Sequence, residues 1–333
     1  MTVVTFPSKI ISHLVKWNPY NEQYVKRGEM MKKGKLKRWH KVVIALVIIV
    51  IILIFLGTYF LFNFAFKRGG YSTQVGEKVN TTWIKKQNPQ VWHQTNKSGL
   101  KLTAYYLPAK TTTNKTMIVV HGYGSTGHKM NNYIRMFHDD GYNVLAPDDE
   151  SFGRSQGEYA GYGWKDRSDI VTWMNMINQK MPTGRLGMFG ISMGAAAVLF
   201  TLPKAPHNVD FAIADCGYNS IYDELKYELG TLFHLPTFPI LPIARIYGNV
   251  FAKYDFYAAN TKQTLAHNKI PLFIIHGNAD KFVPVKDAYI NYQNDHGPKR
   301  LWIVNHATHA DSFNKEGHVY VKKTRAFSEQ YFK

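Results

Sequence analysis

Cysteine is almost absent from this chain of 333 residues, which contains one, Cys216. A single cysteine excludes an intramolecular disulfide framework and a zinc site built from several thiolates. Acidic residues are also few, with 23 Asp and Glu against 41 Lys and Arg. The sequence shows no repeat of fixed period, so it is read as one large folded region with additional segments.

The excess of positive charge is concentrated near the N-terminus. Residues 1–68 hold 12 Lys and Arg and two acidic residues, a net charge of +10, whereas the other 265 residues carry +8. The N-terminal basic residues adjoin an apolar run and are not interleaved with aromatic residues, so we expect no binding to nucleic acid. The remaining +8 is compatible with contact with an anionic cell wall or lipid surface.

Residues 42–66 form an apolar run of 25 residues without a charged side chain. A helix of that length spans about 37 Å, enough to cross a bilayer. Lys and Arg cluster before the run, which predicts a cytoplasmic N-terminus and, at the cell membrane, an extracellular location for the rest of the chain. No A-x-A-like cleavage site follows, so we expect an uncleaved single-pass anchor. The predicted organisation is a cytoplasmic segment 1–41, an anchor 42–66, a tether 67–95 and a folded domain 96–333.

Strand-like and helix-like segments alternate from about residue 98. Strands are expected at 100–109, 115–124, 142–148, 185–192, 209–216, 270–277 and 300–305, with amphipathic helices between most of them. This alternation predicts a mostly parallel sheet flanked by helices. The interval 217–268 breaks the alternation and is rich in Pro, Phe, Leu and Ile. It is interpreted as a helical or irregular lid, with an extra pair of core helices as the alternative.

Ser192 lies in the stretch MFGISMGAAA, between Gly190 and Gly194. The preceding residues predict a strand and the following ones a helix. A nucleophilic serine needs such a sharp strand-to-helix turn, in which small residues avoid steric conflict. Since the pentapeptide alone is a weak signal, the assignment depends on finding an acid, a base and an oxyanion loop elsewhere.

An acid and a base follow in the required order. A serine hydroxyl needs a histidine to take its proton, and the imidazolium that forms needs a carboxylate. Asp280 follows the strand that ends at Gly277, and two histidines, His306 and His309, follow the last strand. His309 is preferred because it lies further out in its loop. Asp215 is the rival acid and is interpreted as structural or pocket-lining.

Two backbone N–H groups are expected to form the oxyanion hole, those of Met193 and Tyr123. Tyr123 lies in the loop VVHGYGSTG, which follows an early strand. In the same loop, His121 is expected to brace the backbone rather than to transfer protons. The other histidines are scattered, so neither a metal nor a cofactor is expected.

The motifs HGYG, GISMG, HGNAD and ATHADSF, in this order, resemble those of the α/β-hydrolase superfamily over residues 95–333. The stretches SFGRSQGEYAGYGWKDRSDIVTWM and ADCGYNSIYDEL resemble bacterial membrane-anchored cell-surface hydrolases. DDESFGRS stands where the family often has an Arg-Gly-His-Gly turn, which places Glu150, Ser151 and Phe152 at one wall of the pocket. The resemblance implies the α/β-hydrolase fold and esterase-like acyl transfer to water.

We therefore expect a serine hydrolase that cleaves a small-molecule or lipid-like ester with an apolar acyl group, through an acyl-Ser192 intermediate. An acyltransferase or a peptidase acting on cell-envelope material is the alternative enzyme. A propeller domain, common in prolyl-peptidase relatives, has no room in this chain, which weighs against the peptidase. A catalytically silent binding or scaffold protein is the alternative from another class, and the presence of Ser192, Asp280 and His309 weighs against it.

Overall fold

The computed structural model describes residues 19–71 and 80–332. The chain divides into two compact units, Met1–Leu56 and Gly57–Lys333. Residues 1–18 of the predicted cytoplasmic segment and residues 72–79 of the predicted tether lie outside the described residues.

The helix α1 (Pro19–Phe66) contains the predicted anchor. Within the part of the chain that the structure describes, it is the one helix long and apolar enough to cross a membrane. Its apolar side chains in the first unit are not packed in a core, since Leu46 and Leu53 are 56% and 61% exposed. By length and apolar composition the helix meets the requirements of a membrane span.

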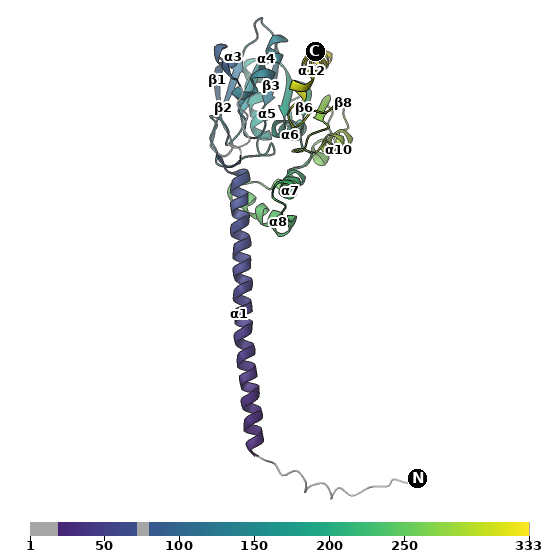
Figure 1. Ribbon diagram of the computed structural model, residues 1–333. Coiled ribbons are helices and arrows are strands. Elements are labelled where there is room, and N and C mark those ends of the chain that lie inside the picture. Colours follow the sequence, from purple (N-terminus) through teal and green to yellow (C-terminus); the bar gives the residue numbers. More distant parts are fainter. Residues whose placement is uncertain (1–18, 72–79, 333) are drawn as a thin grey trace, which may run out of the picture. The chain divides into compact units, whose positions relative to one another are not determined.

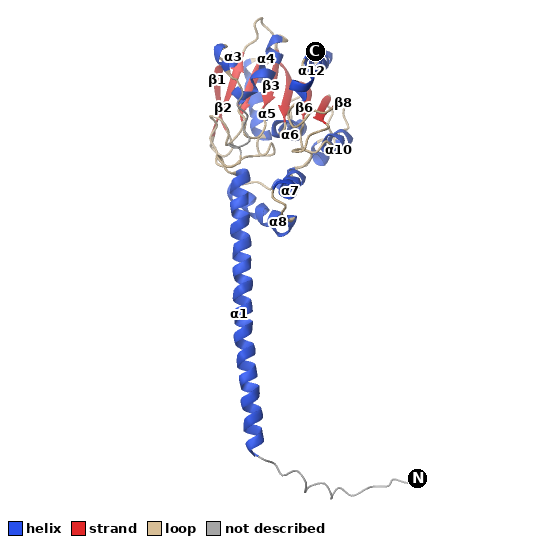
Figure 2. Ribbon diagram, in the orientation of Figure 1, coloured by secondary structure: helices blue, strands red, loops and turns tan. Residues whose placement is uncertain are grey.

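The second unit is built on an eight-stranded sheet of order β1-β2-β4-β3-β5-β6-β7-β8 (Figure 2). The strands are β1 (Gln90–Thr95), β2 (Lys101–Leu107), β3 (Lys115–Val120), β4 (Asn143–Asp148), β5 (Arg185–Ile191), β6 (Val209–Asp215), β7 (Leu272–Gly277) and β8 (Lys299–Val304). β2 pairs antiparallel with both β1 and β4. All the other neighbouring strands, from β4 and β3 to β7 and β8, pair parallel. The carboxyl ends of the parallel strands therefore meet at one edge, where ligands bind in open α/β sheets.

Helices cover both faces of this sheet. Apolar residues of α5 (Arg167–Lys180), α6 (Met193–Thr201) and α10 (Lys286–Asn294) pack in one core cluster with the strands. Those of α3 (Thr82–Lys86), α4 (Asn131–Asp139) and α12 (His318–Tyr331) pack in a second. Short helical segments complete the set, η1 (Gly127–Met130), η2 (Leu202–Lys204) and α11 (Ser312–Glu316). The predicted α/β-hydrolase fold is confirmed.

The segment expected to be a tether instead contains α3 and β1. β1 adds to the sheet edge by pairing with β2, and the Trp92 ring stacks on Tyr106 at 4.4 Å between ring centroids. The polar composition of this stretch concealed it, because an edge strand leaves much of its surface in water. The last ten residues of the predicted anchor, 57–66, likewise belong to the second unit, where Phe62 and Phe66 are buried.

The lid interval is mainly helical. It comprises α7 (Ile221–Leu232), α8 (Thr237–Tyr247), the π-helical turn η3 (Gly248–Ala252), the 3₁₀ turn η4 (Phe256–Ala258) and α9 (Thr261–Thr264). Short irregular stretches separate these helices, and the backbone of Phe238 is non-helical within α8. Lid residues pack with Phe62, Phe66 and Met193 in a third core cluster, so the lid lies over the start of α6 (Figure 1).

Candidate active site

Ser192 occupies the turn between β5 and α6, with φ of 54° and ψ of −121°. A positive φ is unusual for a residue with a side chain and carries strain. A contact with the neighbouring strand β6 stabilises the turn, because the backbone N–H of Ser192 donates to the carbonyl of Asp215 at 2.8 Å. This conformation presents the serine side chain at the carboxyl edge of the sheet, as a nucleophile elbow requires.

The two flanking glycines make this turn possible. A Cβ on Gly190 would overlap the backbone carbonyl of Gly194. A Cβ on Gly194 would overlap the backbone carbonyl of Val120 at the end of β3. Since backbone atoms cannot yield as a flexible side chain can, both positions require glycine, as the motif predicts.

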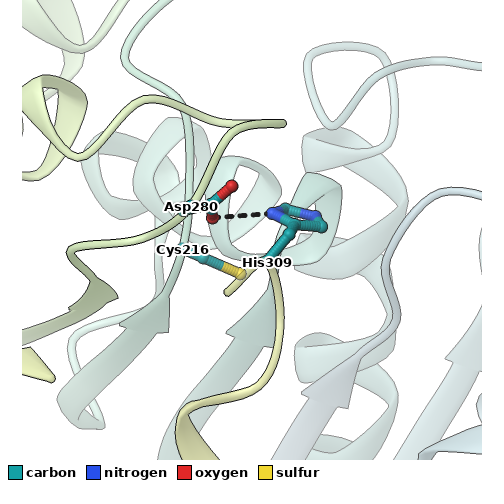
Figure 3. A group of neighbouring side chains, drawn as sticks. All are labelled: Cys216, Asp280 and His309. Atoms are coloured by element: carbon teal, nitrogen blue, oxygen red, sulfur yellow. Dashed lines mark hydrogen bonds and ion pairs between the residues drawn. The ribbon is translucent and has the colours of Figure 1, made fainter. Parts of the chain in front are cut away.

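Three of the predicted side chains form one hydrogen-bonded chain. The Ser192 Oγ lies 2.8 Å from Nε2 of His309, and Nδ1 of the same ring lies 2.8 Å from Oδ2 of Asp280. Figure 3 shows the second of these bonds, with His309 and Asp280 on separate loops. The other histidine of the loop, His306, is placed differently, since its backbone N–H donates to the side chain of Asn278.

The environment of Asp280 keeps its carboxylate ionised. The backbone N–H groups of Phe282 and Val283 both donate to Oδ1 at 2.9 Å. Burial opposes ionisation, but hydrogen bonds from His276 and His309 outweigh it and hold the pKa of Asp280 well below its usual value. A negative charge therefore lies against the His309 ring, where it stabilises an imidazolium.

The rival acid, Asp215, is placed for a structural role. Its carboxylate accepts hydrogen bonds from Tyr320 Oη at 2.9 Å and from Ser312 Oγ at 3.2 Å. Burial raises its pKa to about 6, although both hydroxyls oppose the shift. Asp215 thus ties β6 to the C-terminal helices, and the interpretation of this residue as structural agrees with its partners.

Cys216 lies beside Asp280 and His309 (Figure 3), and donor atoms of the three residues lie within 4.8 Å of one another. Both ring nitrogens of His309 are already engaged, one by Ser192 and the other by Asp280. Burial raises the pKa of the Cys216 thiol well above its usual value, which disfavours the thiolate that a metal would need. The group therefore fits the hydrogen-bonded chain better than a metal site.

Both expected oxyanion donors lie beside Ser192. Met193 is the first residue of α6, so its backbone N–H has no acceptor within the helix. Tyr123 follows β3 and lines the same pocket as Ser192 and Met193. His121 braces this loop, because its Nδ1 lies 2.7 Å from the carbonyl of Gly122 and its Nε2 accepts from the N–H of Asp149 at 3.0 Å.

Two concave spaces meet at Ser192. One, of about 510 Å³, runs under the lid and is lined largely by apolar and aromatic side chains, among them Leu232 and Phe233. The other, of about 860 Å³, contains polar groups such as Lys129 and Asn132 and also touches His309. An apolar acyl group suits the first space, and a polar leaving group or water suits the second.

Several residues that line the pocket were not predicted from the sequence, and three of them bear on its chemistry. Phe64 from the end of α1, and Glu224 and Glu228 from α7, line the space under the lid. Both carboxylate oxygens of Glu224 are buried without a hydrogen-bond partner. Burial raises the pKa of Glu224 well above its usual value and that of Glu228 to about 7. The spacing of four residues in YDELKYELG was the available signal, since it places both acids on one helix face.

Residues 150–152, expected at one wall of the pocket, are not among the described residues that line the two spaces at Ser192. Phe152 packs edge-on against the Tyr123 ring at 5.6 Å between centroids. Glu150 instead forms an ion pair with Lys165 and accepts a hydrogen bond from Asn96 at 3.0 Å.

Residues 14–244, more than half of the chain, match the family described as X-Pro dipeptidyl-peptidase (S15 family). The chain belongs to the S15 family. Among curated proteins it is similar to YqkD of Bacillus subtilis, with 30% identity over 69% of this chain and 75% of that protein. It is also similar to YfhR of Escherichia coli K12, with 24% identity over 68% of this chain and 75% of that protein.

Solved structures share the fold. The Pyrococcus furiosus esterase Pf2001 has a TM-score of 0.62 and 23% identity, covering 78% of this chain and 98% of the esterase. The Pyrococcus horikoshii acylaminoacyl peptidase has a TM-score of 0.57 and 16% identity, covering 74% of this chain and 42% of the peptidase. Family membership and fold together identify this S15 member as an α/β-hydrolase serine hydrolase of esterase or peptidase type, so the silent-scaffold alternative is set aside.

Proposed function

We propose that this serine hydrolase is a membrane-anchored carboxylesterase that cleaves an ester with an apolar acyl group. The observation that carries the proposal is the hydrogen-bonded chain from Ser192 through His309 to Asp280, beside a largely apolar pocket. The polar space on the other side of Ser192 supports a small alcohol as the leaving group.

In the proposed reaction, Ser192 Oγ attacks the ester carbonyl while His309 Nε2 takes the hydroxyl proton. The negative oxygen that forms accepts hydrogen bonds from the backbone N–H groups of Met193 and Tyr123. The C–O bond to the alcohol then breaks, and His309 returns the proton to the leaving oxygen. Water enters, gives a proton to His309 and attacks the acyl carbon, which releases the carboxylic acid and restores the Ser192 hydroxyl. Asp280 orients the imidazole throughout.

The anchoring part of the proposal is supported by α1 and its flanking charges. Only two basic residues, Lys67 and Arg68, directly follow its apolar run, whereas the basic cluster precedes it. This asymmetry favours a cytoplasmic N-terminus and an extracellular catalytic unit. Protease added to intact cells should digest the catalytic unit; digestion only after the membrane is opened would reverse the topology.

The esterase activity is tested with p-nitrophenyl esters of C2 to C12 acids and the full-length protein in detergent. We expect turnover that depends on acyl length, and a loss of at least about 10⁴-fold in Ser192→Ala. Ser98→Ala, at an exposed turn, is the matched control and should keep full activity. Equal activity of Ser192→Ala and the control would contradict the proposal.

A peptidase acting on substrates with a free amine is the second candidate, and one observation favours it. The buried Glu224 carboxylate lacks a partner and lines the pocket that contains Ser192, so an ammonium group would satisfy it. Cleavage of Xaa-Pro p-nitroanilides tests this function. The peptidase function predicts turnover of these substrates, which Glu224→Gln reduces mainly through a higher KM. If no such substrate is turned over, the peptidase function is excluded and only the esterase function remains.

A further inference from the structure

The end of α1 forms part of the wall of the pocket beside Ser192. Phe64 and Ala65 line that pocket together with Phe233 of the lid. The rings of Phe64 and Phe233 meet edge to face, with 5.9 Å between their centroids. The segment that continues the apolar helix therefore takes part in the site itself.

This wall is fixed to the oxyanion loop. The hydroxyls of Tyr123 and Tyr162 both donate to the backbone carbonyl of Ala65. The N–H of Ala160 donates to the carbonyl of Phe66 at 2.7 Å. Because Tyr123 is also a proposed oxyanion donor, the helix end and the catalytic loop are positioned together.

A second apolar space of about 480 Å³ continues from the first. The two share four lining residues, Phe64, Ala65, Glu228 and Phe233, so they adjoin. The second space is otherwise lined by apolar side chains and Thr58. Burial of the Glu228 carboxyl favours its neutral form, which reduces the charge that an acyl chain would meet.

The residues of α1 that line the second space come at the end of a stretch of sequence long enough to cross a bilayer. About 20 helical residues cross the hydrocarbon core of a membrane, and 20 residues counted from Val42 end at Leu61. Thr58 and Leu61 both line the second space. Its lining therefore reaches the depth of the outer leaflet if α1 crosses the membrane.

The outer surface of the lid is also apolar. Exposed large side chains gather in α7, α8 and the segments that follow them, including Leu232, Leu235, Phe238, Ile246, Val250 and Phe251. Between Leu229 and Ala252 the sequence holds one Lys, Arg, Asp or Glu, which is Arg245, and it is paired with Asp255. An apolar surface of this kind, next to the end of an apolar helix, matches the interior of a lipid leaflet.

We propose that the substrate is a long-chain acyl ester held in the outer leaflet, and that its acyl chain reaches Ser192 through the two adjoining spaces between α1 and the lid. The lid surface defined above rests in the same leaflet. This inference rests on the proposed esterase function and membrane anchoring, and it adds the substrate class and the surface through which the substrate enters.

The acyl path is tested by filling the second space. Leu229 lines that space but not the one beside Ser192. In the full-length protein, Leu229→Trp should lower the ratio of kcat/KM for C12 to C4 p-nitrophenyl esters by about ten-fold or more. Val319→Trp, at an exposed site on α12, is the control and should keep the ratio of the unmodified protein. An unchanged ratio in Leu229→Trp would overturn the acyl path.

The lid surface is tested without reference to activity. Because the one natural cysteine is buried, Phe238→Cys and the control Val319→Cys each offer one accessible thiol for an environment-sensitive fluorophore. In vesicles of phosphatidylcholine and phosphatidylglycerol, the label at position 238 should emit at shorter wavelength and be quenched by doxyl-labelled lipids. The label at position 319 should behave as in water. If the label at position 238 is quenched no more than the label at position 319, the lid does not rest in the membrane.

A fluorophosphonate probe separates failure of this inference from failure of the proposed function. If Leu229→Trp reacts with the probe and keeps its C12 to C4 ratio, the active site stands and the acyl path is wrong. If the unmodified protein neither reacts with the probe nor cleaves any ester, the proposed function itself is wrong. Loss of probe reaction in Leu229→Trp alone indicates a damaged fold, and the position-238 label then decides the inference.

Discussion

Phe66→Ala should destabilise the catalytic unit, although Phe66 lies in the run that the sequence assigns to the membrane anchor. The Phe66 side chain is 2% exposed. Its ring stacks on Phe62 at 4.7 Å and packs against Tyr162 at 4.8 Å and Phe256 at 5.6 Å, measured between centroids. Removing a buried phenylalanine ring costs about 3–5 kcal/mol of unfolding free energy, because it leaves a cavity as well as losing burial.

The matched control is Phe60→Ala, since Phe60 is 70% exposed and lies six residues earlier in the same helix. For a unit of this size, about 3–5 kcal/mol corresponds to a fall in Tm of roughly 6–10 °C. Thermal unfolding of the full-length protein in detergent, followed by tryptophan fluorescence, measures it. Phe60→Ala should shift Tm by less than about 2 °C. Equal shifts in the two variants would refute the assignment of the helix end to the catalytic unit.

Three further predictions concern the site and its buried acids. In the ester assay, Asp280→Asn should lower kcat by about 10³–10⁴-fold, whereas Asp215→Asn should lower it by less than about ten-fold. The reverse ranking would identify Asp215 as the acid of the triad. Gly194→Ala should prevent recovery of folded protein or lower Tm by several degrees, because its Cβ would meet the Val120 carbonyl; an unchanged Tm contradicts that contact. Burial, together with nearby carboxylates, raises the pKa of Asp169 to about 7, so the folded state holds this proton more tightly than the unfolded state. Stability should therefore fall as pH rises from about 4 to 7, and Asp169→Asn should flatten the dependence of Tm on pH over that range.

The parallel sheet could be predicted from the sequence because its strands are buried on both faces. β3, β5, β6 and β7 each contain a short apolar run, MIVV, MFGI, FAIA and LFII respectively. Ser192 was identifiable because both glycines that its turn requires, Gly190 and Gly194, lie within two residues of it in the sequence. The order of Ser192, Asp280 and His309 along the sequence then matched the ends of three predicted strands.

The role of the α1 end could not be predicted, because hydropathy does not distinguish a phenylalanine in lipid from one in a protein core. Phe60 and Phe62 are two residues apart in one apolar run, yet one is exposed and the other is buried. Similarly, β1 depends on its pairing with β2, a contact that no local pattern specifies. In both cases the deciding interaction is tertiary.

Reaction of the full-length protein with a fluorophosphonate probe, followed by mass spectrometry of its peptides, shows directly whether Ser192 is the nucleophile. We expect one adduct, on Ser192, that is absent in Ser192→Ala and forms at least about 100-fold more slowly in His309→Ala, because the hydroxyl then lacks its base. A folded protein that gives no adduct, or an adduct on another serine that survives Ser192→Ala, would contradict the assignment of Ser192 as the nucleophile.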